Sequence, residues 1–161
     1  MKPIFVATTA AALLTGAALA DHHGHSETPA GAEAVAQGIY DAFAAGDVPA
    51  FVSYLHPDIV WNEAENFPYA DGNPYQGPDA VMNGVIGRTM TEWDGFAATP
   101  ERMIAEDNEV AVMGRYTGTH LETGEAIDAQ FVHVWTIEDG QAVAFQQYVD
   151  TWQVRQASEA D

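Results

Sequence analysis

Hydrophobic positions follow a helical period where the folded part of the chain begins. Val35, Ile39, Ala42 and Phe43 fall at i, i+4, i+7 and i+8, which places them on one face of a helix. Gly46 follows this run, and glycine readily takes the left-handed conformation after a last helical turn. The pattern therefore predicts an amphipathic helix that begins near residue 32 and ends before Gly46.

A short helix and a strand are predicted next. Asp47 is a residue type that caps helix N-termini, and Pro49 is tolerated in a first helical turn. Pro57 ends this helix, because proline cannot continue the hydrogen-bond pattern. Residues 59–63 then have the composition of a short strand.

A third helix is predicted after a loop. Residues 66–76 contain two prolines, two tyrosines, two asparagines and a glycine, which is typical of a loop. Pro78 fits the first helical position, and Asp79 is favourable at the positive end of a helix. The buried face of this helix is expected to carry Val81, Val85, Ile86 and Trp93.

After Pro100 the period of the pattern changes from about 3.6 to about 2, as expected for strands. Turn residues separate the apolar runs, and Asp139-Gly140 is a strong hairpin signal. Helices followed by an antiparallel meander predict an α+β domain with helices packed on one face of a curved sheet. The four predicted strands cover residues 102–105, 109–118, 127–137 and 142–154.

The first twenty residues have the pattern of a secretory signal peptide. Lys2 precedes an apolar run over residues 4–14, and Ala18-Leu19-Ala20 is a typical cleavage site. The apolar run is short for a membrane span, so we expect cleavage after Ala20 and no membrane segment in the mature protein. Export to a bacterial periplasm or to the medium follows. The expected organisation is a signal peptide (1–20), a flexible leader (21–31), one domain (32–154) and an acidic tail (155–161).

Composition excludes several classes of function. The chain has 24 acidic residues against 5 lysines and arginines, and a formal net charge of −19. Such a surface repels nucleic acids and anionic membranes, because contacts to phosphates need lysine and arginine. The chain has no cysteine, which excludes disulfides, thiolate nucleophiles and thiolate metal sites.

Five short motifs, in order along residues 32–154, resemble the nuclear transport factor 2-like superfamily and, in their C-terminal pair, its SnoaL-like, ketosteroid-isomerase-related branch. The resemblance implies a cone-shaped fold with three N-terminal helices packed on a curved, mostly antiparallel sheet around one pocket. It implies no single activity, because members include isomerases, dehydratases, cyclases and non-catalytic proteins. The motifs are Ile39–Asp47, Pro57–Trp61, Tyr75–Val81, Phe131–Trp135 and Gln147–Thr151.

Glu63 and His133 are the candidate catalytic residues. Aligned with ketosteroid isomerases, Glu63 falls on their catalytic carboxylate, and an apolar pocket would raise its pKa enough for a general base. His133 falls on their second acidic residue, where it could donate to an oxyanion or act as acid or base. A surface position for Glu63 and a structural role for His133 are the alternatives.

The sequence also departs from those enzymes. The helical tyrosine of the isomerases falls near Ile39, and Tyr40 is expected to point elsewhere on the helix. The catalytic aspartate of the cyclases falls near Gln147, which cannot serve as a base. Asp150 is either a second pocket carboxylate or a structural acceptor of backbone N–H bonds. Neither named reaction is therefore transferred to this chain.

Abundant aromatic residues suit a flat apolar ligand, or simply a domain core. We expect a small-molecule pocket, with or without acid–base chemistry; a non-catalytic ligand-binding or dimerisation module is the alternative. Val132, Val134 and Val149 on the outer sheet face predict a homodimer. The residues expected to line the pocket, besides the catalytic pair, are Tyr40, Tyr54, Trp61, Met82, Trp93, Phe131, Trp135, Gln147 and Asp150.

A possible metal site lies before the domain. Cleavage after Ala20 would expose Asp21-His22-His23-Gly24-His25, and a free amine with histidine at the third position binds Cu(II) or Ni(II) in square-planar geometry. The alternative is a solvated polar leader. No other cofactor is expected, and a periplasmic copper or nickel handler is the third functional hypothesis.

Overall fold

The computed structural model describes residues 29–159. The predicted signal peptide and the histidines at 22, 23 and 25 lie outside these residues. Within the described range, no helix is long and apolar enough to cross a bilayer.

The first two helices are α1 (Pro29–Ala44) and α2 (Val48–Ser53), and the sequence predicts both. The prediction that Pro57 ends α2 is wrong, because the helix ends at Ser53 and Pro57 lies in the strand β1 (Leu55–Asn62), which starts before the predicted residues 59–63. Asp47 caps α2, because its carboxylate accepts a hydrogen bond from the backbone N–H of Ala50 at 3.0 Å. Gly46 has a φ of 66°, and its left-handed conformation turns the chain from α1 into α2. The apolar face of α1 packs on the sheet.

The third helical segment has three parts: α3 (Pro78–Val81), η2 (Met82–Ile86) and α4 (Gly87–Glu92). The middle part is a π-helical turn, a rare geometry that often occurs beside functional sites. The loop before it contains η1 (Ala70–Gly72) and β2 (Tyr75–Gln76). The spacing of Trp93 predicted a position on the buried helix face. This prediction is wrong, because the backbone of Trp93 begins a strand opposite His120.

The other strands are β1 (Leu55–Asn62), β3 (Trp93–Glu106), β4 (Glu109–His120), β5 (Ala126–Glu138) and β6 (Gln141–Val149). They form a six-stranded sheet in the order β2-β1-β6-β5-β4-β3. Neighbouring strands run antiparallel except β1 and β6, which are parallel. The β5–β6 hairpin turns at Asp139 and Gly140, both at positive φ, which confirms the predicted hairpin.

The strand prediction for residues 102–105 was too short. β3 has 14 residues and its pairing with β4 shifts register twice, between Asp94 and Ala97 and between Pro100 and Arg102. Such bulges interrupt the alternation of buried and exposed side chains. The sequence pattern therefore revealed only the last, regular part of the strand.

The strand prediction for residues 142–154 was too long. β6 ends at Val149, and Asp150 caps a helix, α5 (Thr151–Ser158). The Asp150 carboxylate accepts a hydrogen bond from the backbone N–H of Gln153 at 3.2 Å. Asp150 therefore has the structural role, and part of the predicted acidic tail is helical.

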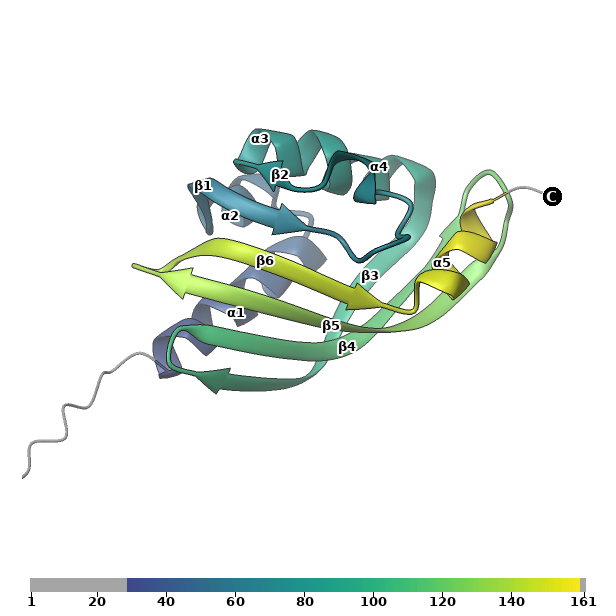
Figure 1. Ribbon diagram of the computed structural model, residues 1–161. Coiled ribbons are helices and arrows are strands. Elements are labelled where there is room, and N and C mark those ends of the chain that lie inside the picture. Colours follow the sequence, from purple (N-terminus) through teal and green to yellow (C-terminus); the bar gives the residue numbers. More distant parts are fainter. Residues whose placement is uncertain (1–28, 160–161) are drawn as a thin grey trace, which may run out of the picture.

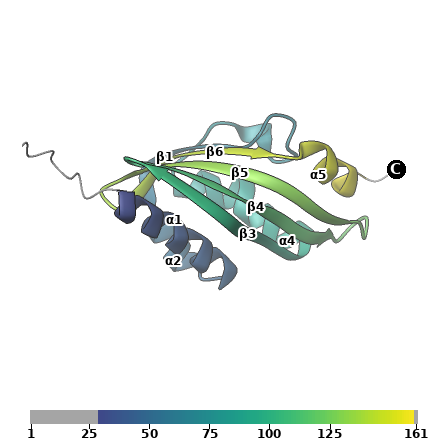
Figure 2. The ribbon, with the colours of Figure 1, turned by 90° about the horizontal axis from the view of Figure 1, so that it is seen from below.

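The helices α1–α4 cover one face of the curved sheet and leave the other face open (Figures 1 and 2). Helix α1 runs behind β4, β5 and β6 in the first view. The second view shows α1 and α2 beneath the sheet, with α5 at one end of it. The predicted α+β cone with helices on a mostly antiparallel sheet is confirmed. Side chains from both layers meet in the space between them.

Candidate functional site

A small cavity of about 60 Å³ lies between the helices and the concave sheet face. Aromatic side chains supply much of its wall. Its polar side chains come from five elements and from the loop after β1. They are Tyr40 on α1, Glu63 after β1, Thr89 on α4, Tyr116 on β4, His133 on β5 and Gln147 on β6.

Glu63 is a fully enclosed carboxylate. Its side chain is only 2% exposed, and Oε1 accepts a hydrogen bond from Nε1 of Trp61 at 2.5 Å. Asn73 holds its backbone from both sides, accepting from the Glu63 N–H at 3.0 Å and donating to the Glu63 carbonyl at 2.8 Å. Oε2 has no hydrogen-bond partner, and it is the only such buried side-chain polar atom in the described part of the chain.

Burial raises the pKa of the Glu63 carboxyl to about 7, against a smaller lowering by the hydrogen bond of Trp61 and by the nearby amide of Gln147. Near neutral pH the group is therefore divided between its acid and its carboxylate form. A carboxyl with this pKa can take a proton from a bound molecule and return it, which is the requirement for a general base.

His133 lies between two tyrosines. Nδ1 is 2.7 Å from the hydroxyl of Tyr40, and Nε2 is 2.5 Å from the hydroxyl of Tyr116. Its ring stacks on Phe131, with the centroids 4.1 Å apart. Burial lowers the pKa of His133 to about 3, so the imidazole is neutral at ordinary pH. It does not serve as a cationic acid in this state.

Each tyrosine oxygen also accepts one N–H bond whose direction is fixed. Trp135 Nε1 donates to Tyr40 at 3.1 Å, and an indole nitrogen can only donate. Gln147 Nε2 donates to Tyr116 at 3.0 Å. The Gln147 amide cannot be reversed without loss, because its Oε1 accepts the backbone N–H of Ala64 at 3.0 Å.

In the network of His133, Tyr40 and Tyr116, the hydroxyl proton of one tyrosine therefore has no acceptor. A neutral imidazole has one donor and one acceptor nitrogen, so it takes a proton from one tyrosine and gives one to the other. The tyrosine that receives the imidazole proton keeps its own O–H free to donate. This holds for both tautomers: the free donor is Tyr40 in one and Tyr116 in the other.

The free hydroxyl and the unpartnered carboxylate oxygen belong to the same small cavity. The pKa of Tyr116 lies well above its usual range because of burial and, second, the charge of Glu63, which shows that the two groups interact electrostatically. A molecule bound there can accept a hydrogen bond from a tyrosine while it faces Oε2 of Glu63. Tyr40 also keeps its proton, because burial raises its pKa.

The structure brings together six of the residues expected from sequence: Tyr40, Trp61, Glu63, His133, Trp135 and Gln147. Tyr40 corrects one expectation, because it does not point elsewhere on the helix. The Tyr40 hydroxyl contacts His133, and Tyr40 and its neighbour Ile39 both line the cavity. The hydroxyl that seemed lost at Ile39 is thus supplied one position later.

Five expected lining residues lie elsewhere. Tyr54 packs against Gly38, where a Cβ would meet the tyrosine oxygen at 2.3 Å, and Met82 is half-buried in η2. Trp93 lines an outer hollow and donates to the Tyr69 hydroxyl at 3.0 Å. Phe131 is one layer away, beneath the His133 ring, and Asp150 caps α5.

Tyr116 is the polar residue that sequence reasoning missed. It alternates with Val112 and Gly114 on β4, and all three are buried on the inner face of the sheet. Residues at every second position of a strand share one face, so this spacing in the sequence could have placed Tyr116 on the inner face of the sheet. Gly114 is required beside it, since a Cβ at that position would lie 2.6 Å from the Phe131 ring.

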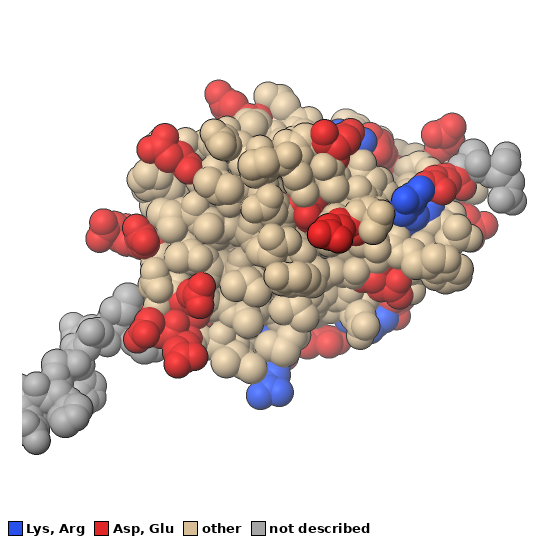
Figure 3. All heavy atoms as spheres, viewed as in Figure 1, with Lys and Arg blue, Asp and Glu red and all other residues tan. Residues whose placement is uncertain are grey.

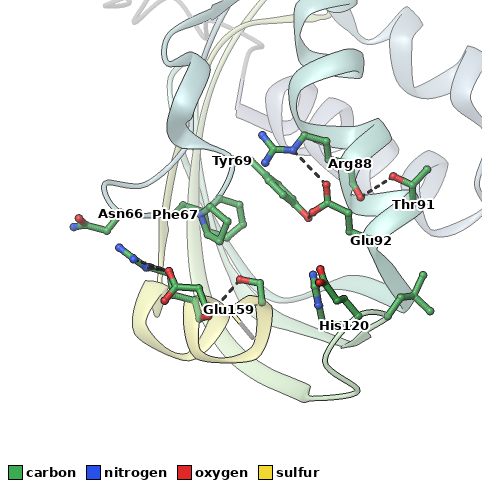
Figure 4. Close-up of a pocket in the computed structure, with 13 residues that line it drawn as sticks. Asn66, Phe67, Tyr69, Arg88, Thr91, Glu92, His120 and Glu159 are labelled. Carbon is green, nitrogen blue, oxygen red and sulfur yellow. Dashed lines mark hydrogen bonds and ion pairs between the residues drawn. The ribbon is translucent and has the colours of Figure 1, made fainter. Parts of the chain in front are cut away.

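A larger depression of about 700 Å³ lies on the surface between the loop at Asn66–Tyr69, α4, the β4–β5 connection and α5 (Figure 4). Four of its charged side chains, Arg88, Glu92, Arg155 and Glu159, form ion pairs, and Glu122 also lines it. Arg88 contacts Asp71 at 2.9 Å and lies over the Tyr69 ring, 4.2 Å from its centroid. The Tyr69 hydroxyl donates to Glu92 at 2.8 Å. These contacts already engage the side chains of Arg88, Tyr69 and Glu92 with one another.

Within residues 29–159, no group of three or more histidine or acidic side chains is close enough together to hold a metal ion.

Comparison with solved structures finds the same fold in bacterial proteins. An NTF2-like protein of Burkholderia thailandensis is 30% identical, with a TM-score of 0.76, over 80% of this chain and 98% of that one. An NTF2-like protein of Burkholderia pseudomallei is 27% identical, with a TM-score of 0.73, over 81% and 98%. TerC, co-crystallised with polyporic acid, is 25% identical, with a TM-score of 0.71, over 79% and 97%.

A more distant structure shows the fold alone: a putative SnoaL-like polyketide cyclase from Jannaschia, 17% identical, with a TM-score of 0.72, over 84% of this chain and 96% of that one. No curated protein matches the chain. The family model described as a SnoaL-like domain matches residues 36–145. The chain therefore belongs to the SnoaL-like domain family of the NTF2-like superfamily.

Proposed function

We propose that the protein binds an uncharged carbonyl compound in its cavity and moves a proton at the carbon next to the carbonyl group. One observation carries the proposal: the unpartnered oxygen of Glu63 and a free tyrosine O–H occupy the same enclosed space. A base for the C–H bond and a donor for the developing oxyanion are the two groups that this reaction needs.

In the proposed reaction, the Glu63 carboxylate takes a proton from the carbon as the C–H bond breaks. The electron pair of that bond forms a carbon–carbon double bond to the carbonyl carbon, and the π pair of the carbonyl group moves to its oxygen, which accepts a hydrogen bond from the free tyrosine hydroxyl. Glu63 then returns the proton to the same or another carbon. Exchange or isomerisation results, the carboxylate is restored, and no other reactant is consumed.

His133 has a positioning role in this scheme. Because it stays neutral, it fixes both tyrosine oxygens without adding a charge to the cavity. The tautomer of its ring decides whether Tyr40 or Tyr116 donates to the bound oxygen. Lysine and arginine are absent from the described side chains that line the cavity, which favours an uncharged ligand over an anion.

The comparisons support ligand chemistry in this family, since neighbours are described as polyketide cyclases and one was co-crystallised with polyporic acid. The test is deuterium exchange. We expect the protein to exchange the α-hydrogens of 2-butanone or 2-cyclohexen-1-one in D2O, as followed by NMR. A compound that binds in the cavity without exchange would instead support the non-catalytic ligand-binding alternative.

The small cavity volume limits the size of the group that can enter, under either hypothesis. About 60 Å³ holds about two water molecules at roughly 30 Å³ each. A protein that only binds would show the same affinity for a ketone when Glu63 is replaced by Gln, and no exchange in either form.

We also propose that two copies pair through the outer sheet face. Met113, Val132 and Tyr148 are consecutive across β4, β5 and β6 there, and Tyr148 is 58% exposed. Figure 3 shows uncharged atoms over most of the middle of this view, although Glu101 and Arg115 line the same outer hollow as these three residues. Light scattering should give a dimer for the wild type and a monomer for Val134→Glu. A wild-type monomer would contradict the proposal.

Two proposals concern residues 1–28, which lie outside the described part of the chain. Export with cleavage after Ala20 would leave a mature protein whose first residue is Asp21, as mass spectrometry of protein from the producing cell can show. The mature N-terminus should bind Cu(II) through His22, His23 and His25. Unchanged Cu(II) binding in protein truncated before Ala30 would place the metal elsewhere.

A further inference from the structure

A second hollow lies on the helical side of the molecule, next to the cavity. It has a volume of about 370 Å³ and opens between the α1–α2 turn, α4 and the start of β3. Alanines of the turn and the side chains of Met90 and Trp93 supply part of its wall. Among its described lining residues, Asp47 is the only charged one, and its carboxylate is already used to cap α2.

The hollow and the cavity share a wall. Phe43, Phe51, Ile86, Thr89 and Phe96 line both spaces. The ring of Phe43 lies 6.1 Å from that of Phe51 and 6.3 Å from that of Phe96, with the latter pair nearly perpendicular. Phe43 and Phe96 are only half-buried. Their rings have no polar atoms, so only packing holds them, and rotation of either ring breaks no hydrogen bond.

Volume indicates that neither space is a complete site. The cavity holds about two waters, whereas pockets for organic ligands commonly measure about 300–1,000 Å³. The hollow reaches this range, but Asp47 and Thr89 are its only polar side chains among the described residues, and both already make hydrogen bonds. The cavity has free polar groups that could orient a ligand and lacks room. A single molecule that crosses the phenylalanine wall would use both.

We infer that the hollow is a tail subsite, so that the ligand is an elongated, uncharged ketone with its carbonyl end in the cavity and an apolar chain in the hollow. This inference rests on the proposed function for the carbonyl end. The chain passes between Phe43 and Phe96. An anionic tail is disfavoured, because the hollow offers no cation and the protein has a strong negative charge.

The test is a series of methyl ketones from 2-butanone to 2-undecanone, with binding measured by tryptophan fluorescence on the full domain. Each buried methylene should strengthen binding about fourfold, until the chain fills the hollow and the affinity levels off. Trp61 and Trp135 line the cavity and Trp93 lines the hollow, so both ends of the ligand approach a reporter.

A matched pair of surface variants locates the tail. Met90→Glu places a charge at the hollow, at a side chain that is 53% exposed, and should remove the gain for long ketones while short ones bind as before. Leu121→Glu changes a 61% exposed residue outside the hollow and should retain the wild-type slope. Both positions are exposed, so neither change burdens the core.

Affinity that does not depend on chain length, including no binding at all, would overturn the inference, as would equal slopes in the two variants. Failure of the proposed chemistry is a separate result. Length-dependent binding without deuterium exchange would leave the tail subsite standing and remove the reaction. Deuterium exchange of short ketones, with binding that does not depend on chain length, would support the reaction and remove the tail subsite.

Discussion

Two polar clusters of this molecule differ in how their hydrogen bonds close. Around the surface depression, Arg88, Asp71, Tyr69 and Glu92 satisfy one another with ion pairs and hydrogen bonds. In the cavity, one tyrosine hydroxyl proton and one oxygen of Glu63 have no hydrogen-bond partner. The difference shows that a large depression with charges is not the better site. Unused bonding capacity in an enclosed space is the more informative sign, since buried polar groups are otherwise paired.

The largest expected effect comes from removing the unpartnered oxygen. Glu63→Gln should reduce the exchange rate by about 10²–10⁴-fold, because the general base is lost while the shape is kept. Glu92→Gln makes the same chemical change in the surface depression and should leave the rate unchanged. NMR exchange rates with one ketone at one pH compare the two. A Glu63→Gln protein that retains most of the rate would contradict the assigned base.

Variants of the two tyrosines test whether either hydroxyl can serve as the free hydrogen-bond donor. Tyr40→Phe and Tyr116→Phe each leave one tyrosine that can accept the imidazole proton and donate its own, so each alone should cost only a few-fold in rate. The double variant has no hydroxyl donor and should lose about 10²–10³-fold, the usual effect of removing an oxyanion donor. Additive effects of the two single changes would show that the tautomer of His133 does not redistribute the donor.

Stability should depend on pH through Glu63. The folded-state pKa of Glu63 is about 7, above its ordinary value of 4.5, so the folded protein holds this proton more tightly than the unfolded chain does. The stabilisation is complete below pH 4.5 and is lost as the pH rises to 7, by about 3 kcal/mol. Urea unfolding of wild type and Glu63→Gln at several pH values gives the difference. A difference that stays constant from pH 4.5 to 7 would contradict the raised pKa.

The smallest effect is expected at the surface depression. Arg88→Met removes the ion pairs with Asp71 and Glu92 and the contact with the Tyr69 ring, yet the Arg88 side chain is 31% exposed. Exposed pairs contribute little, so unfolding in urea should show a loss of about 1 kcal/mol or less, with unchanged exchange activity. A larger loss of activity than of stability would mean that the depression takes part in the reaction.

Sequence reasoning failed where chain segments meet. Trp93 has the spacing of a helix residue, but pairing with His120 on β4 makes it the first residue of a strand. The helical spacing predicted that Tyr40 points away from the pocket, but its hydroxyl lies 2.7 Å from Nδ1 of His133, a residue 93 positions away in the chain. Helical and strand periods describe which face a residue occupies, and they carry no information about the partner across the core.

Local sequence was enough to predict the family, the α+β class, the cap at Asp47 and the inward direction of His133, because these depend on local period, turn residues and motif order. It also identified Glu63 as a candidate, by resemblance. Only the tertiary structure decided that His133 is neutral between two tyrosines, that one hydroxyl and one carboxylate oxygen remain unused, and that a phenylalanine wall separates two spaces. Those features arise from strand register and from burial, which are properties of the packed chain and not of any segment.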